Sequence, residues 1–175
     1  MSKIVFTNMA KKKHIRDFKI FEFIDNNVDV VVGLLVLCKS TNRIFLIQRN
    51  DINKYWSLLS GGYDFKKDID YLDCISREME EELFLDMDKI NIEIKNGGDE
   101  FIVSKNRNFK YYYGFVDKEF DVILNDENLK WGWFSKDNES IINGSEMYIG
   151  LPENLYPGLK QKIDTIFILN NTKIK

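Results

Sequence analysis

Four glutamates lie within five residues of this sequence, at positions 78, 80, 81 and 82. On a helix, like charges three or four residues apart repel each other by a few tenths of a kcal/mol per pair. Carboxylate oxygens are also the preferred ligands of hard divalent cations, and Mg²⁺ commonly binds beside phosphate groups. The cluster therefore indicates either a metal site or a solvated acidic surface.

A helix predicted over residues 69–85 divides these glutamates into two groups. Because successive residues turn by about 100°, Glu78, Glu81 and Glu82 form one stripe and Glu80 lies on the far side. An apolar stripe for the core adjoins the three carboxylates and consists of Leu72, Ile75, Met79 and Leu83. Carboxylates at the edge of a core are compatible with metal binding, and an ordinary acidic helix face explains the stripe equally well.

Two glycines, Gly61 and Gly62, precede this helix at the end of a short predicted strand. Glycine lets the backbone approach a ligand closely, because it has no Cβ. The segment 62–85 resembles the Nudix box, the signature of the Nudix hydrolases. That signature is glycine, five residues, glutamate, seven residues, and then Arg-Glu-apolar-x-Glu-Glu-x-Gly-apolar. Residues 77–82, Arg-Glu-Met-Glu-Glu-Glu, match its second half, and Gly62 matches its first glycine.

The sequence departs from this signature in three ways. Asp68 replaces the first glutamate, one extra residue precedes Arg77, and Phe84 replaces the final glycine. We expect the loop or the first helical turn to absorb the insertion. Glycine at the last position allows a left-handed helix end, which costs other residues about 1–2 kcal/mol. We therefore expect the helix to continue to Asp86, with the carboxylate stripe preserved.

The resemblance implies both a reaction and a cofactor. Nudix hydrolases cleave a nucleoside diphosphate linked to another moiety, by attack of an activated water on phosphorus. The implied cofactor is Mg²⁺, with Mn²⁺ as the alternative, because such a cation neutralises phosphate charge and lowers the pKa of a bound water. By position, the implied metal ligands are the Gly61 carbonyl and the carboxylates of Glu78, Glu81 and Glu82.

The resemblance also assigns catalytic roles. Glu78 and Glu81 are implied as catalytic residues, and the choice of general base among the glutamates stays open. Arg77 is implied to orient a glutamate through a charge-assisted hydrogen bond, together with Asp68 at the start of the helix.

A later segment, residues 124–134, is similar to the one in which many family members carry a further glutamate. Glu127 is the candidate for a second metal ligand or a base, and Asp126 and Glu100 are the alternatives. An ordinary acidic turn would also account for these residues.

Two candidates for substrate binding lie outside these motifs. Arg49 ends a predicted strand near the site and could bind phosphate, although a surface role fits it nearly as well. Tyr112 faces opposite to Tyr111 and Tyr113 on a strand and could stack on a base, although core packing is the more common outcome.

The predicted secondary structure gives an α/β fold with a mixed sheet and helices on both sides. With the family resemblance, this implies a Nudix-type α/β/α sandwich. Strands are predicted at residues 30–38, 43–49, 56–59, 90–95, 100–105, 109–117 and 129–135. A loop with Gly144, Gly150 and Pro152 leads to a last helix over 156–168, with Pro157 near its first turn. We expect a basic extension at 1–19 and a single catalytic domain at 20–175.

The composition excludes several classes of protein. The chain has 175 residues and a net charge of −3, which gives no electrostatic case for general nucleic-acid binding. Cys38 and Cys74 lack metal-ligand spacing, and His14 is far from both, so a zinc site is not expected. Because the longest apolar run, 30–38, is too short to cross a bilayer, we expect a soluble cytoplasmic protein without a membrane partner.

Two classes of function remain. The first is a Mg²⁺-dependent pyrophosphohydrolase that acts on a nucleotide-type substrate. RNA decapping is a variant of it, supported only by the basic cluster at 11–16. The second is a catalytically inactive Nudix-fold module that binds a nucleotide. The sequence leaves the oligomeric state open, and a homodimer is compatible with it.

Overall fold

The computed structural model describes residues 28–172, and within them it contains nine strands and two α-helices. The strands are β1 (Asp29–Cys38), β2 (Arg43–Arg49), β3 (Trp56–Ser57), β4 (Leu59–Gly62), β5 (Ile92–Ile102), β6 (Arg107–Val116), β7 (Asn128–Phe134), β8 (Glu139–Ile142) and β9 (Glu146–Ile149). The helices are α2 (Tyr71–Leu83) and α3 (Leu159–Asn171), with short 3₁₀ helices η2 (Met87–Lys89) and η3 (Val103–Lys105).

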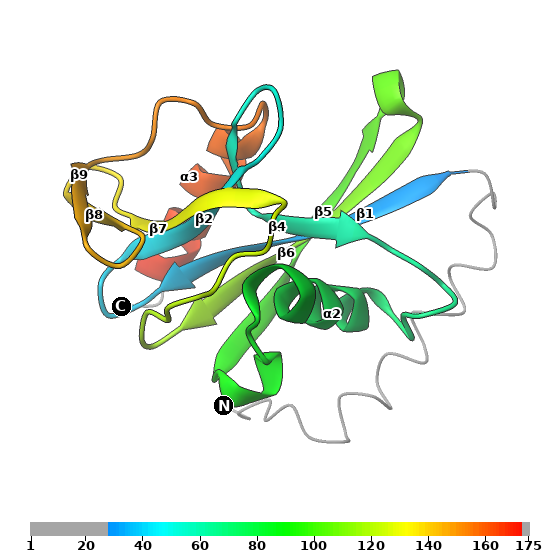
Figure 1. Cartoon of the computed structure of the whole chain (residues 1–175), viewed down its shortest axis with the longest axis horizontal. Coiled ribbons are helices and arrows are strands. Elements are labelled where there is room, and N and C mark those ends of the chain that lie inside the picture. The colour runs from blue at the N-terminus through cyan, green and yellow to red at the C-terminus, as the bar shows by residue number, and fades with distance from the viewer. Residues whose placement is uncertain (1–27, 173–175) are drawn as a thin grey trace.

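All nine strands belong to one mixed sheet (Figure 1). Its main path runs β5-β6-β1-β2-β7-β8-β9, while β3 pairs with β2 and β4 pairs with β1. β1 is parallel to β6 and antiparallel to β2 and β4. The predicted α/β class with a mixed sheet is confirmed.

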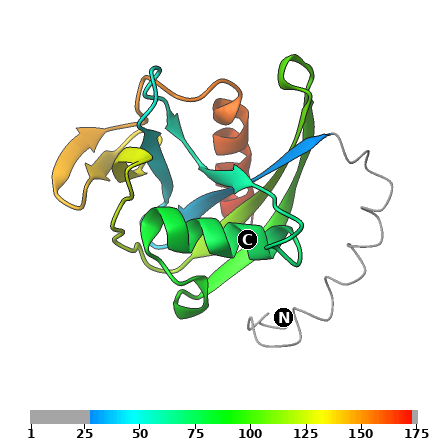
Figure 2. The ribbon, with the colours of Figure 1, turned by 45° about the vertical axis from the view of Figure 1, so that its right-hand side comes forward.

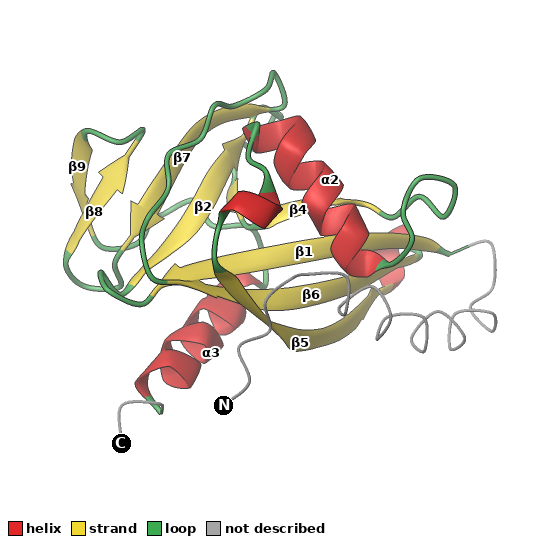
Figure 3. Cartoon of the chain, turned by 90° about the horizontal axis from the view of Figure 1, so that it is seen from below, coloured by secondary structure: helices red, strands yellow, loops and turns green. Residues whose placement is uncertain are grey.

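The two helices cover opposite faces of this sheet (Figures 2 and 3). β1 contributes side chains to the core on both faces of the sheet, because its successive side chains point to opposite faces. Leu34 and Val36 lie in the core beneath α2, whereas Leu35 and Leu37 lie in the core beneath α3. The strand predicted at 30–38 is therefore confirmed and is buried on both faces, and the α/β/α arrangement is confirmed as well.

Helix α2 begins later and ends earlier than predicted. Asp70 caps its start, since the Asp70 carboxylate accepts a hydrogen bond from the Asp73 N–H at 2.8 Å. The predicted apolar stripe is confirmed, because Ile75, Met79 and Leu83 are buried. Glu80 is exposed on the other side of the helix, as expected.

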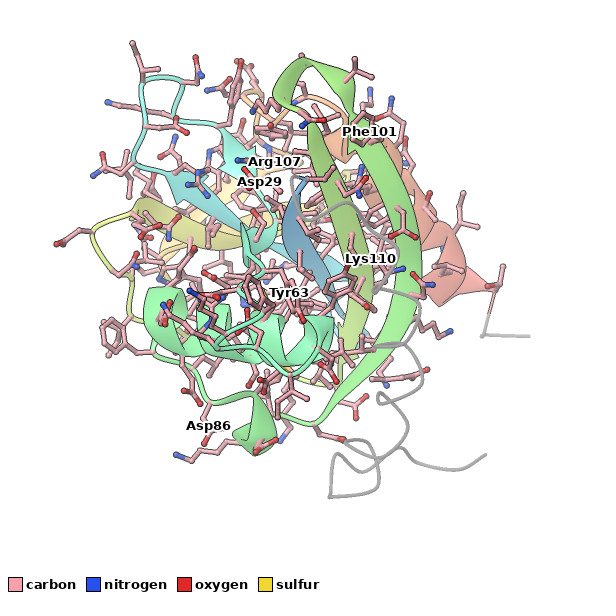
Figure 4. All side chains as sticks on the ribbon, turned by 90° about the vertical axis from the view of Figure 1, so that its right-hand side faces the viewer. Asp29, Tyr63, Asp86, Phe101, Arg107 and Lys110 are labelled. Carbon is pink, nitrogen blue, oxygen red and sulfur yellow. The ribbon has the colours of Figure 1, made fainter. Side chains whose placement is uncertain are left out.

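The prediction that the helix continues to Asp86 is wrong. Phe84 itself adopts the left-handed conformation, with φ of 50°, that glycine usually provides. The Phe84 N–H donates to the Glu80 carbonyl and the Leu85 N–H to the Met79 carbonyl, both at 3.2 Å. These bonds satisfy carbonyls at the end of the helix. Asp86, which Figure 4 labels beyond α2, instead caps η2 through the Asp88 N–H.

Three further predictions differ from the structure. The two strands expected at 90–95 and 100–105 are one continuous strand, β5, with a register shift between Asn96 and Gly98. The loop expected after β7 contains the β8–β9 hairpin. The last helix, expected over 156–168, is α3 at Leu159–Asn171, and Pro157 lies just before its first turn.

Some predictions concern residues that the structure does not describe. The basic extension at 1–19, including the cluster at 11–16, lies outside the described residues. Among residues 28–172, neither helix is long and apolar enough to cross a membrane. The cytoplasmic location stays a prediction.

The helix end generates a stability prediction. Replacing Phe84 with glycine should raise the free energy of unfolding by about 1 kcal/mol, because it removes the strain of a left-handed non-glycine residue. The lost ring contributes little, since Phe84 is 66% exposed. Urea denaturation would measure the change. Phe84→Ala, which loses the ring but keeps the strain, is the control and should not be stabilised. A helix continuing through residue 84 would give the opposite sign for glycine.

Candidate active site

Gly61 and Glu78 are in direct contact between strand β4 and helix α2. A Cβ added at Gly61 would overlap the Glu78 carboxyl group, so only glycine lets this buried carboxylate lie against the strand. Gly62 has open space where its Cβ would be. Its carbonyl accepts a hydrogen bond from Arg77 Nη2 at 2.9 Å. The glycine pair thus brings the strand backbone against the helix that carries the glutamates.

Arg77 connects the carboxylates of the site. Its Nε and Nη2 donate to the two oxygens of Asp68 at 2.8 and 3.0 Å. Its Nη1 donates to Glu78 Oε1 at 2.6 Å and to Glu81 Oε2 at 3.1 Å. The expected pairing of Arg77 with Asp68 and a glutamate is therefore present, and its two-pronged geometry fixes the guanidinium plane.

Asp68 is held as a buried carboxylate, with only 3% of its surface exposed. Burial opposes its ionisation, but hydrogen bonds from Arg77 and from the Asp64 N–H outweigh burial and lower the pKa of Asp68 below its ordinary value. The charged pair is therefore the stable form at neutral pH.

Asp68 pairs with Arg77 although the segment between them carries the inserted residue. Nine positions separate Asp68 from Arg77, one more than in the family signature. Asp68 also has a shorter side chain than the glutamate that it replaces. A turn in which the Lys67 and Asp68 N–H groups donate to the Asp64 carbonyl leads the chain to Asp68, and the extra residue follows it, between Asp68 and Arg77. As predicted, the insertion leaves the helix register unchanged.

Glu82 is the most strongly perturbed carboxylate of the site. It is 4% exposed, and its Oε2 accepts a hydrogen bond from Asn128 Nδ2 at 3.0 Å. Burial raises the pKa of Glu82 to about 7, and repulsion from Glu78 and Glu127 acts in the same direction. The Asn128 bond and the Arg49 charge act against this rise. Burial likewise raises the pKa of Glu78, against the effect of Arg77.

Most of the sequence-predicted residues come together here. Glu127 acts electrostatically on both Glu78 and Glu82, and Arg49 acts on Glu82. The Glu127 carbonyl accepts a hydrogen bond from the Asn50 N–H at 2.7 Å, which fastens the turn before β7 to the end of β2. Arg49 and Glu127 therefore lie beside the carboxylates of α2.

Other candidates lie elsewhere. Glu100 pairs with Lys162 of α3 at 2.8 Å, on the face of the sheet opposite to α2. Tyr112 packs on the α2 side but near Tyr71, the first residue of that helix, and Lys110 (labelled in Figure 4) lies 5.5 Å above its ring.

Two tryptophans and two cysteines belong to the core on the α2 side of the sheet. Trp131 and Trp133 are core residues. Cys38 and Cys74 are free and buried. The sequence did not predict Asn128 as a residue of the site, because nothing in it links Asn128 to Glu82, which lies 46 positions away.

The donor set suits a hard cation. Within residues 28–172, no three His, Cys, Asp or Glu side chains are gathered closely enough to hold a metal ion. Glu78 and Glu81 both accept hydrogen bonds from Arg77 Nη1 instead. Even so, Glu78 and Glu82 are buried, repel each other and have raised pKa values. A divalent ion would relieve this repulsion, and oxygen donors fit Mg²⁺.

The fold and this site together define a class of protein, an α/β/α sandwich in which a carboxylate-bearing helix packs against a glycine-ended strand. The model of the NUDIX domain family matches residues 28–144, more than half of the chain. The protein therefore belongs to the NUDIX family. The prediction of a Nudix-type hydrolase acting on phosphoric anhydride bonds is confirmed at this level.

Solved structures share the fold. A MutT/nudix family protein from Enterococcus faecalis aligns with a TM-score of 0.59 at 15% identity, over 97% of this chain and 76% of its own. A second similar structure is the bifunctional NMN adenylyltransferase/ADP-ribose pyrophosphatase of Francisella tularensis, solved with AMP and a Mn ion. It aligns with a TM-score of 0.54 at 15% identity, over 92% of this chain and 48% of its own. The Ap4A hydrolase of C. elegans aligns with a TM-score of 0.50 at 22% identity, over 61% of this chain and 79% of its own. No functionally curated protein matches the sequence.

The Arg77–Asp68 pair generates the second prediction. Asp68→Asn should lower the free energy of unfolding by about 3 kcal/mol, because it removes the buried charge that accepts hydrogen bonds from both Nε and Nη2 of Arg77. Thermal denaturation would measure the loss. Glu81→Gln is the matched control, since it removes a carboxylate from the same arginine at a side chain that is 55% exposed, and its effect should stay under about 1 kcal/mol. Equal losses in the two variants would contradict the special role of Asp68.

Glu82 generates the third prediction. Its pKa is higher in the folded protein, at about 7, than its ordinary value of 4.5, so the folded state binds more protons between these values. The free energy of unfolding of the metal-free protein should therefore fall as pH rises through this range, by roughly 3 kcal/mol from this group. Glu82→Gln should remove that fall.

Urea denaturation in EDTA, at several pH values across the range, would measure it. Glu80→Gln is the control, because Glu80 is exposed on the same helix. The same pH dependence in Glu82→Gln as in the wild type would show that Glu82 does not titrate there.

Proposed function

We propose that the protein is a Mg²⁺-dependent pyrophosphohydrolase that cleaves a nucleoside diphosphate linked to another moiety. The observation that carries this proposal is the convergence of two buried glutamates, Glu78 and Glu82, with Glu127 and Arg49. A cluster of partly desolvated carboxylates with raised pKa values is typical of functional sites, because it destabilises the fold unless a ligand compensates it.

The proposed ligands of the cation are the carboxylates of Glu78, Glu81 and Glu82 and the Gly61 carbonyl. When bound, Mg²⁺ would neutralise phosphate charge and lower the pKa of a bound water, and Mn²⁺ is the alternative ion. Arg77 holds Glu78 through the bond from Nη1 to Oε1. Glu81 is largely exposed, so its carboxylate is free to turn from Arg77 toward a cation at little packing cost.

The remaining residues act on the substrate and on protons. Glu127, exposed on the turn before β7, accepts the proton of the attacking water at its carboxylate. Arg49 binds a phosphate oxygen of the substrate and stabilises its charge in the transition state. Arg77 keeps the glutamates oriented, so that they do not rearrange during the reaction.

The identity of the substrate is less closely defined than the reaction. Similar folds occur in an Ap4A hydrolase and in an ADP-ribose pyrophosphatase, which supports a nucleotide-type substrate without selecting one. RNA decapping has only the basic cluster at 11–16 in its favour, and that cluster lies outside the described residues.

A second candidate function is nucleotide binding without hydrolysis. The observation that favours it is the pairing of Glu78 and Glu81 with Arg77, which leaves no three-residue metal group within residues 28–172. A protein of this kind would bind a nucleotide but would release no product from it.

The experiment is a panel of nucleoside-diphosphate substrates incubated with Mg²⁺ and scored by released products. The wild type should turn over at least one of them. Glu78→Gln should lower kcat by about a hundredfold or more, because it removes a charged ligand of the cation. Glu80→Gln, the matched control on the exposed side of α2, should keep its activity. Nucleotide binding without turnover in the wild type would favour the second function, and equal activity of the two variants would contradict the assigned site.

A further inference from the structure

One buried amide contacts the site and is absent from the sequence-predicted set. Asn128, the first residue of β7, is 6% exposed. Its Nδ2 donates to Glu82 Oε2 at 3.0 Å and to Asn125 Oδ1 at 3.3 Å. Its own Oδ1 is buried and has no hydrogen-bond partner within the described part of the chain.

This arrangement is unfavourable for stability. A buried carbonyl oxygen without a partner has lost its hydrogen bonds to water and gained none in return. An apolar side chain of similar size, such as leucine, would fill the same space without that loss. The contribution of Asn128 therefore lies in what its NH₂ group does to Glu82.

The segment that ends in Asn128 is also fastened to α2 through the backbone. The Ile123 N–H donates to the Leu83 carbonyl at 3.2 Å, and the Asn125 N–H donates to the Glu82 carbonyl at 3.1 Å. These carbonyls belong to the last turn of the helix, which has no intrahelical partners for them. The segment 123–128 thus binds Glu82 twice, through the Glu82 backbone carbonyl and through its side chain, which Asn128 contacts.

The other side of the same turn is fastened to β2. The Asn50 N–H donates to the Glu127 carbonyl at 2.7 Å, and Asn50 Nδ2 donates to the Asp126 carbonyl at 2.9 Å. Within the turn, the Glu127 N–H donates to Asn125 Oδ1 at 3.1 Å. The backbone of Glu127 is therefore held between the end of α2 and the residue that follows Arg49.

We propose that Asn128 is a positioning residue, which fixes the Glu82 carboxylate and couples it to the turn that carries Glu127. This inference rests on the proposed function, because it assumes that both carboxylates serve one cation and one substrate. An amide suits the role, since its NH₂ group donates to a carboxylate without adding a charge. An aspartate would add another negative charge beside Glu82, and a leucine would leave Oε2 without its donor.

The test is Asn128→Leu, with two measurements. Binding of Mn²⁺ to the protein alone, followed by electron paramagnetic resonance, should be about tenfold weaker than in the wild type, as for other residues that orient a metal ligand. With an active substrate, kcat should fall by about tenfold or more while KM changes little, because Asn128 does not touch the substrate. Asn128→Ser, which adds no bulk, should show the same losses and keeps the test valid if the leucine variant does not fold.

A matched control is Asn170→Leu on α3. Asn170 is also a buried amide, 8% exposed, and its Nδ2 donates to Asn42 Oδ1 at 3.1 Å. This variant should keep wild-type Mn²⁺ affinity and kcat, whatever its change in melting temperature. Equal effects of the two leucine variants would reduce Asn128 to a structural role and overturn the proposal.

The outcomes separate this inference from the proposed function. If the wild type turns over substrate and both Asn128 variants match it in Mn²⁺ affinity and kcat, the inference falls and the proposed function stands. If the wild type binds Mn²⁺ more tightly than the variants but hydrolyses no substrate, the role of Asn128 is supported and the proposed function falls. A wild type that neither binds Mn²⁺ nor turns over substrate overturns both.

Discussion

The ion pair between Arg77 and Asp68 is the constraint on which the candidate site depends. It joins the turn before α2 to the helix itself, and the same guanidinium binds the Gly62 carbonyl at the end of β4. Three chain segments therefore share one planar group with fixed directions for its hydrogen bonds. Because Asp68 is buried and charged, movement of any of these segments would leave an uncompensated charge. This explains how the glutamate stripe keeps one orientation against the sheet.

Around that fixed pair lie carboxylates that repel one another. Glu78 and Glu82 are both buried on the α2 side of the sheet, and each is repelled by Glu127. Arg77 compensates Glu78, whereas Glu82 has only the hydrogen bond from Asn128 and the Arg49 charge. A cation would complete the compensation. The same burial that weakens the metal-free protein is what would make binding of such a ligand favourable.

The strands of the central sheet and both helices could be predicted from the sequence, because continuous apolar runs and helical stripes report burial directly. The errors fall where local sequence does not determine the backbone. Phe84 takes a conformation that its side chain disfavours, since the bonds to the Glu80 and Met79 carbonyls close the helix there. The short strands β8 and β9 resemble a loop, because their stability comes from pairing with β7 and with each other.

The sequence by itself determined the family, the helix that carries the glutamates, and which of them share a stripe, because these depend on residue order and on the 3.6-residue period of a helix. Only the tertiary structure decided how those carboxylates are compensated. The Asn128 bond to Glu82 and the approach of Arg49 and Glu127 both join segments distant in the chain. Such contacts depend on how the strands pair in space, and no local pattern of residues records that pairing.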